Sequence, residues 1–188
     1  WTLNETTDLL LKKEFDLCRE RQIPHRSFQE LHLKSVVPFK HADLNLWRDS
    51  LHHGLQYQVE DSNIVLHGGI DDVWFDQRQE KLIVVDYKSQ ANSRPVDIND
   101  YLAGGYRQAY KIQLDFYAYL LTKMGFDVSP IGYFYVCNAD RGAPVFNGQI
   151  MFQETLVPYE WSIDWLNPKI WEMTDILNSY DLPEQNPS

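Results

Sequence analysis

The chain has 188 residues, of which 44% are hydrophobic and 14% are aromatic. This length and composition predict a single globular domain over residues 1–188 and exclude a disordered chain. No apolar run approaches the ~20 residues of a membrane-spanning helix, and no secretory signal is recognisable, so we expect a cytoplasmic protein that does not enter a membrane.

The formal net charge of −10 is unfavourable for binding nucleic acid, because basic patches normally supply most of the non-specific affinity for phosphates. The excess of acidic residues lies within residues 51–188, since residues 1–50 hold eight basic and eight acidic side chains. A basic cluster near the N-terminus is the best candidate for contacting phosphates, although a solvated helix face explains it equally well. It comprises Lys12, Lys13, Arg19, Arg21 and Arg26.

The two cysteines, Cys18 and Cys137, are far apart and show no metal-ligand spacing. They are expected to be buried free thiols, which are typical of a reducing compartment. Four histidines in the first third of the chain invite a zinc interpretation, but their spacing matches no zinc motif and cysteine partners are missing. They are His32, His41, His52 and His53.

Apolar residues at helical spacing near the N-terminus predict a first helix that ends before Pro24. They are Leu10, Leu11, Phe15 and Cys18. Asn4 or Thr6 can cap the start of this helix. Glu14 lies one turn from two of the apolar residues, so its carboxylate is expected to point inward, unless it pairs with a nearby lysine at the surface.

The sequence between this helix and residue 57 is irregular, and only short helical turns are expected there, at residues 29–32 and 44–51. A strand over residues 63–66 is expected to lead into Gly68 and Gly69. Two adjacent glycines indicate a bulge or a close approach of the backbone, which suits a passing phosphate, or a simple kink.

Two β-prone runs, residues 70–75 and 82–85, flank five polar residues and predict a β-hairpin. Each run carries acids that a buried strand normally rejects. Asp71 and Asp72 lie in the first run and face opposite sides of the strand, so Asp72 is expected to be a structural acid. Asp86 follows the second run.

Lys88 follows Asp86 by two residues, so both side chains lie on the same face of the second strand. Pairing of the two strands is expected to bring Asp71 to the same point. Carboxylates gathered at strand ends repel each other unless a cation lies between them. Oxygen ligands of this kind suit Mg²⁺ or Mn²⁺, and a lysine beside them can hold an anionic oxygen or a nucleophilic water.

A polar stretch over residues 89–100 is expected to form a mobile loop at the mouth of this site. The clearest helix covers residues 105–124, and on it Gln113 and Tyr117 lie one turn apart on a common face. A polar edge of an ordinary core helix is the alternative for these two residues. Half-buried strands and a last amphipathic helix are expected at residues 131–137, 149–157 and 161–180.

Three short motifs occur in an order and spacing that resemble the PD-(D/E)XK nuclease superfamily. They are Gly69-x-Asp71, Asp86-x-Lys88 and Gln113-x-x-x-Tyr117. The matching core covers residues 63–119. Within the superfamily the chain is most similar to the RecB-type branch, which includes the CRISPR spacer-acquisition exonucleases. An aspartate without a preceding proline, and aspartate rather than glutamate before the lysine, are usual in that branch.

The resemblance implies an α/β fold with a mixed central β-sheet flanked by helices, a restriction-endonuclease-like core. It also implies a divalent-metal-dependent deoxyribonuclease that acts on single- or double-stranded DNA. Relatives often place a metal ligand on the first core helix, and Glu14 is the candidate here, with His32 or His41 as alternatives. Some relatives carry an iron–sulfur cluster on flanking cysteines, but none can form within this chain.

The resemblance further implies a role for each matching residue. Asp71, Asp86 and the carbonyl oxygen of Tyr87 would hold Mg²⁺ or Mn²⁺, and Lys88 would position the attacking water. Gln113 and Tyr117 would touch the substrate or steady the site, with Arg107 and Lys111 near phosphates. Two alternatives remain open: a binding domain of the same fold that does not cleave, and an unrelated metal-dependent phosphohydrolase.

Overall fold

The computed structural model describes residues 2–29 and 33–179. The helices are α1 (Thr2–Arg21), α2 (Leu44–Arg48), α3 (Gln108–Lys123) and α4 (Leu166–Asn178), with 3₁₀ turns η1 (Arg26–Phe28) and η2 (Gly105–Arg107). The strands are β1 (Val36–Pro38), β2 (Leu55–Gln58), β3 (Val65–Gly68), β4 (Asp72–Asp76), β5 (Lys81–Asn92), β6 (Ile131–Asp140) and β7 (Phe152–Glu160). None of the helices in the described ranges is long and apolar enough to cross a membrane.

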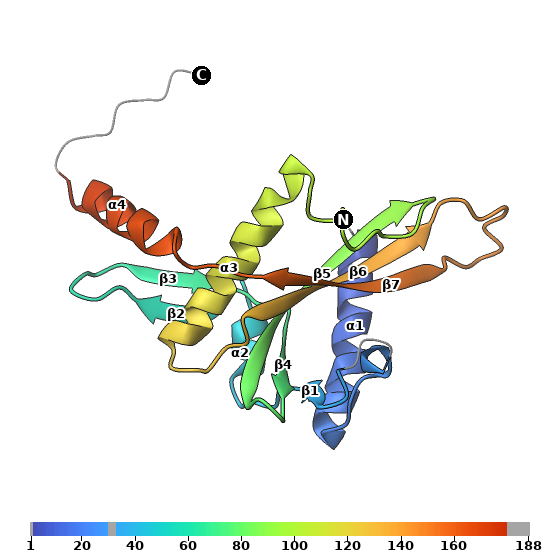
Figure 1. The fold of residues 1–188 in the computed structure, drawn as a ribbon, viewed down its shortest axis with the longest axis horizontal. Helices are drawn as coiled ribbons and strands as arrows, with labels where there is room; N and C mark the ends of the chain where they lie inside the picture. Colours follow the sequence, from blue (N-terminus) through green and yellow to red (C-terminus); the bar gives the residue numbers. More distant parts are fainter. Residues whose placement is uncertain (1, 30–32, 180–188) are drawn as a thin grey trace, which may run out of the picture.

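Five strands form the central sheet in the order β1-β4-β5-β6-β7 (Figure 1). The β4–β5 hairpin is antiparallel, as predicted, and β5 then pairs in parallel with β6 before β7 returns antiparallel. The connection between the parallel strands carries α3, as a parallel pair requires. The sheet is therefore mixed, and the predicted α/β class is confirmed.

Alternation along β5 separates two cores on the two faces of the sheet. Leu82 and Val84 pack toward α3, and Ile83 and Val85 pack toward α1. The core beneath α1 is mainly aromatic. Phe15 of α1 lies at its centre and contacts five rings, those of His25, Phe28, Trp74, Tyr87 and Tyr135. α1 thus packs on one face of the sheet, and α3 packs on the other in a core that also includes residues of α2 and α4.

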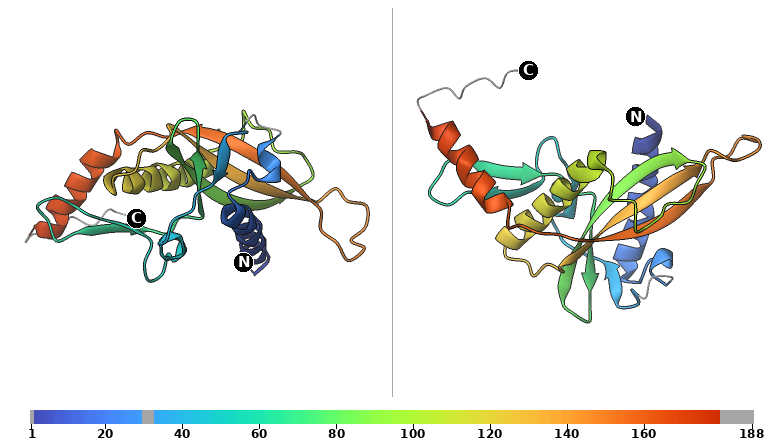
Figure 2. Two further views of the ribbon diagram at one scale, coloured as in Figure 1. Left: turned by 90° about the horizontal axis from the view of Figure 1, so that it is seen from below. Right: turned by 45° about the horizontal axis from the view of Figure 1, so that its top comes forward.

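The β2–β3 hairpin lies beside α3, outside the main sheet. α4 follows β7 and lies near the same hairpin, whereas the connection between β6 and β7 projects from the opposite end of the molecule (Figures 1 and 2). The strands β5, β6 and β7 therefore lie between the β2–β3 hairpin with α4 at one end and the β6–β7 connection at the other.

Several boundaries differ from the predictions. Residues 89–92 continue β5, because they pair with β6 up to Asp140, so the expected loop begins only after Asn92. The strands β1 and β2 lie in the region expected to be irregular. Leu10 was expected in the core but is 58% exposed. Residues 30–32 of the expected helical turn at 29–32 lie outside the described ranges.

The Gly68-Gly69 pair marks a close approach within the protein rather than at a phosphate. A Cβ atom on Gly69 would lie 2.6 Å from the Cα atom of Ser50, and a Cβ atom on Gly68 would lie 2.9 Å from the ring of Tyr117. Contacts this short do not occur, so larger residues would displace the backbone here. Gly68 thus brings the end of β3 against α3, and Gly69 brings the chain against Ser50, just after α2.

A buried network of charges holds α1, α2 and β4 together. Asp72 is fully buried and accepts hydrogen bonds from Arg19, from Arg48 (2.9 Å) and from the hydroxyl of Tyr87 (2.8 Å). Both arginines also bond Asp16 of α1. Asp72 is thus a structural acid, as expected, and Arg19 is not free to contact phosphates.

Asp72→Asn should lower the free energy of unfolding by roughly 3–5 kcal/mol, because it removes the buried counter-charge of Arg19 and Arg48 and leaves them the partly exposed carboxylate of Asp16. Urea denaturation at pH 7 measures this, with Asp175→Asn on the exposed surface of α4 as the matched control. Equal stability of the two variants would contradict the proposed role of the network.

Candidate active site

Asp71 lies at the entrance to β4 and is fixed by main-chain contacts on two sides. Its Oδ2 atom accepts a hydrogen bond from the amide of Tyr87 (2.9 Å), and its carbonyl oxygen accepts one from Nε of Arg48 (3.1 Å). A quarter of the side chain remains exposed. The Asp72 network therefore also orients the neighbouring Asp71, through Arg48 and Tyr87.

Asp86 lies on the α3 face of β5 and is completely buried. Its Oδ2 atom forms an ion pair with the ammonium group of Lys88, but neither carboxylate oxygen has a hydrogen bond of good geometry from any described residue. Buried carboxylates normally accept several hydrogen bonds. Asp86 is thus an acid whose bonding capacity the protein itself leaves unfilled.

The ammonium group of Lys88 links the sheet to α3. It donates a hydrogen bond to Oε1 of Gln113 (3.2 Å) and lies 4.6 Å from the ring centre of Tyr110. Nε2 of Gln113 in turn donates to the hydroxyl of Tyr117 (2.8 Å). Four of the predicted site residues, Asp86, Lys88, Gln113 and Tyr117, therefore form one continuous chain of contacts.

Burial raises the pKa values of both acids. Burial raises the pKa of Asp86 from 3.8 to about 7, the Asp71 carboxylate adds to the rise, and Lys88 opposes it. Burial likewise raises the pKa of Asp71, and Lys12 opposes it. These carboxyl groups hold protons more tightly than ordinary acids, because the neighbouring lysines offset only part of the cost of desolvation.

The family model of the PD-(D/E)XK nuclease superfamily matches residues 3–172 of this chain. The chain belongs to the PD-(D/E)XK nuclease superfamily. The mixed sheet flanked by helices is consistent with the restriction-endonuclease-like fold of that superfamily. Searches of curated proteins and of solved structures found no match.

α1 contributes Lys12, which is not among the predicted site residues, to the surroundings of Asp71. Nζ of Lys12 bonds Asp8 (2.8 Å) and lies 3.6 Å from Oδ1 of Asp71. The i,i+4 spacing of Asp8 and Lys12 indicates a shared helix face, but no local signal shows that this face meets Asp71. A lysine ammonium group thus lies beside each site aspartate, that of Lys12 beside Asp71 and that of Lys88 beside Asp86.

Glu14, the expected ligand from α1, is not brought to the aspartates. Its carboxylate contacts His25 (2.9 Å) and Arg26 (2.6 Å). Successive α-helical residues are about 100° apart, so Glu14 and Lys12 lie on different faces of α1. Arg26 also bonds Glu154, so it is not free for phosphates either. The prediction for Glu14 followed from apolar spacing, which did not fix the rotation of α1.

Of the two histidine alternatives to Glu14, His41 is described and belongs to an aromatic cluster instead. His41 stacks on Trp47, with ring centres 4.3 Å apart, in an aromatic cluster with Phe39 and Phe126. His32 lies outside the described ranges.

The two basic residues expected to contact phosphates lie near the N-terminal end of α3. Nη2 of Arg107 bonds Oε1 of Gln90 (3.2 Å), which lies on the same face of β5 as Lys88. Lys111 lies two residues before Gln113 and is half-buried. Arg107 is thus connected to the strand that carries Asp86 and Lys88.

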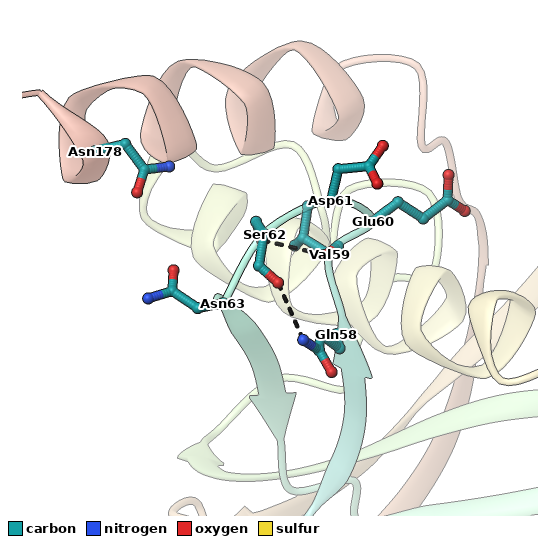
Figure 3. A pocket seen from close by; sticks show the side chains of 7 residues that line it. All are labelled: Gln58, Val59, Glu60, Asp61, Ser62, Asn63 and Asn178. Atoms are coloured by element: carbon teal, nitrogen blue, oxygen red, sulfur yellow. Dashed lines mark hydrogen bonds between the residues drawn. The ribbon is translucent and has the colours of Figure 1, made fainter.

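A cavity of about 740 Å³ lies away from this chemistry, at the turn of the β2–β3 hairpin (Figure 3). Asn178 of α4 faces the turn across it, and the turn is held by hydrogen bonds between Ser62 and both Gln58 and Val59. The base of the hairpin, at Gly68, is the end near Tyr117. None of the predicted site residues lines this cavity, so we do not assign the active site to it.

The aspartate pair fits the divalent metal that members of the superfamily typically use. Among the described residues, no group of three His, Cys, Asp or Glu side chains could hold a metal ion, and the pair would offer two side-chain ligands. The unfilled buried oxygens of Asp86, the neighbouring Asp71 and the raised pKa values match the oxygen ligands that Mg²⁺ and Mn²⁺ prefer.

Asp86→Asn should become more stable relative to the parent as pH rises from 5 to 8. The native Asp86 keeps its proton up to about pH 7, whereas the unfolded chain loses it near 3.8, so ionisation destabilises the parent in this interval. The gain should amount to a few kcal/mol, at about 1.4 kcal/mol per pKa unit. Urea denaturation in EDTA at both pH values measures it, and a pH-independent difference would contradict the assignment.

Proposed function

We propose that this superfamily member is a divalent-metal-dependent deoxyribonuclease of the RecB-type branch, similar to the CRISPR spacer-acquisition exonucleases, and that it acts in the cytoplasm. The contact chain from Asp86 through Lys88 to Gln113 and Tyr117 carries this proposal. A binding domain that does not cleave has no need for two desolvated acids with raised pKa values.

Asp71, Asp86 and the carbonyl oxygen of Tyr87 would hold Mg²⁺ or Mn²⁺. When bound, the ion would supply positive charge that stabilises the phosphoryl oxygens in the transition state. Glu14 is not part of this set, because its carboxylate is already bonded to His25 and Arg26.

Lys88 would orient the attacking water and offset negative charge on the scissile phosphate. The water oxygen attacks phosphorus, one ester oxygen leaves, and the two protons of the water end on the products or the solvent. Gln113 keeps the ammonium group of Lys88 at the mouth of the site, and the hydroxyl of Tyr117 fixes Gln113. Arg107 and Lys111 would contact phosphates beyond the cleaved bond.

The test is cleavage of end-labelled single- and double-stranded DNA in Mg²⁺, Mn²⁺ or EDTA, together with thermal melts with and without Mn²⁺. The parent should cleave only with metal, and Mn²⁺ should raise its melting temperature. Asp71→Asn should lose both effects, whereas Lys88→Ala should keep the metal-induced stabilisation and lose about 10²-fold in turnover. Undiminished cleavage in EDTA, or a parent whose melting does not respond to metal, would overturn the proposal.

Lys12→Met should bind Mn²⁺ more tightly than the parent in the absence of DNA, by roughly 2- to 10-fold, because the ammonium group next to Asp71 competes with an incoming cation. Isothermal titration calorimetry measures the dissociation constant. Lys13→Met is the matched control, since Lys13 is exposed on another face of the same turn. Equal affinities of the two variants would show that Lys12 does not compete with the metal.

A further inference from the structure

A row of side chains along one face of η2 and α3 extends outward from the active site. Tyr106, Tyr110, Gln113 and Tyr117 are spaced by four, three and four residues, the spacing of one helix face. Gln113 and Tyr110 contact the ammonium group of Lys88. Tyr106 belongs to the 3₁₀ turn η2 that leads into α3, and its neighbour Arg107 bonds Gln90, which lies two residues after Lys88 on the same face of β5. It therefore lies next to the catalytic centre rather than in it.

Tyr106 presents a large aromatic surface to solvent in a fixed orientation. The residue is 73% exposed, yet its hydroxyl accepts a hydrogen bond from Nε of Arg107 (2.8 Å). Its ring packs so closely over Gly104 that a Cβ atom there would lie 2.8 Å from the ring. The guanidinium group of Arg107 is itself held, 3.5 Å from the ring centre of Tyr101. An ordered, exposed ring is pre-organised for stacking, because little freedom is lost on binding.

A cavity of about 250 Å³ lies beside Tyr106, between the end of β5 and η2. Its polar lining includes Gln90, Asn92, Asp97, Asp100 and the guanidinium group of Arg107. The two carboxylates outnumber the one guanidinium group, so the lining as a whole disfavours a phosphate group. Carboxylate and amide oxygens instead accept hydrogen bonds from the ring and exocyclic N–H groups of nucleobases. The cavity thus suits an uncharged base better than the DNA backbone.

We propose that Tyr106 and this cavity form a subsite for the base of an unpaired nucleotide adjacent to the phosphodiester bond that is cleaved. The proposal rests on the function proposed above and names its substrate as single-stranded or unpaired DNA. Aromatic side chains that bind single strands stack on the faces of the bases. Inside a duplex both faces of a base are covered by its neighbours, so Tyr106 can stack on an internal base only after that base has left the helix.

Stacking on bases would also provide DNA affinity that a protein with a net charge of −10 cannot gain from electrostatic attraction to phosphates. An acidic protein gains little from general attraction to phosphates, so contacts with bases must supply a larger share of its affinity. Affinity for single strands should consequently depend on Tyr106 and depend weakly on salt.

The experiment measures dissociation constants for a labelled single-stranded oligonucleotide and a blunt duplex by fluorescence anisotropy in Ca²⁺, with a gel to verify that the DNA stays intact. Tyr106→Ala should weaken binding of the single strand roughly 5- to 100-fold and leave binding of the duplex unchanged. Tyr106→Phe, which keeps the ring, should bind the single strand within about 3-fold of the parent. Trp171→Ala, which removes an exposed aromatic residue on α4, is the matched control and should have no effect.

A set of oligonucleotides with one abasic position each then identifies the contact. At one position, loss of the base should weaken binding to the parent but not to Tyr106→Ala, because the two changes remove the same interaction. The subsite is refuted if Tyr106→Ala binds the single strand as the parent does, if it weakens both DNA forms equally, or if no abasic position shows this coupling. If DNA binding depends on Tyr106 as expected but the parent does not cleave in Mg²⁺ or Mn²⁺, the proposed nuclease activity is refuted and the subsite stands. If the parent cleaves but its binding does not depend on Tyr106, the subsite is refuted and the nuclease activity stands. A parent that binds no DNA would refute both.

Discussion

The structure depends on a carboxylate placed where a β-sheet normally holds an apolar side chain. Asp86 lies in the middle of β5, between β4 and β6, and is fully buried without a hydrogen-bond donor of good geometry among the described residues. Lys88, two residues along the same face, supplies the nearby charge that makes this burial tolerable. Desolvation of this kind destabilises the fold, and sites built for binding often show it.

The adjacent acids Asp71 and Asp72 show how the fold separates structural from functional charges. Asp72 faces α1 and is fully satisfied by Arg19, Arg48 and Tyr87, so it holds secondary-structure elements together. Asp71 faces the opposite side, where its carboxylate accepts a hydrogen bond from the amide of Tyr87 and lies 3.6 Å from the ammonium group of Lys12. The hydrogen bonds of Asp72 hold Arg48 and Tyr87 in place. These two residues in turn bond Asp71 and fix its position in the site.

α3 completes the site because one of its faces packs on the sheet while an adjoining face reaches Lys88. Its buried face, with Leu114 and Ala118, packs on the sheet, and Gly132 of β6 allows the close approach, since a Cβ there would lie 2.7 Å from Leu114. An adjoining face carries Gln113 to Lys88. The same row of residues continues to the exposed ring of Tyr106, so one rigid element links the acids to the outer surface.

The sequence by itself determined the features that follow from local periodicity. The β4–β5 hairpin, the common face of Asp86 and Lys88 and the pairing of Gln113 with Tyr117 depend on spacings of two and four residues, which any strand or helix imposes. The rotation of α1 was decided by tertiary structure alone. Apolar residues surround this helix, and burial of Phe15 among the aromatic rings leaves Leu3, Leu10 and Leu17 exposed, turns Glu14 toward Arg26 and brings Lys12 to Asp71. Contacts between residues distant in the chain carry no local pattern, and so only the folded structure could reveal them.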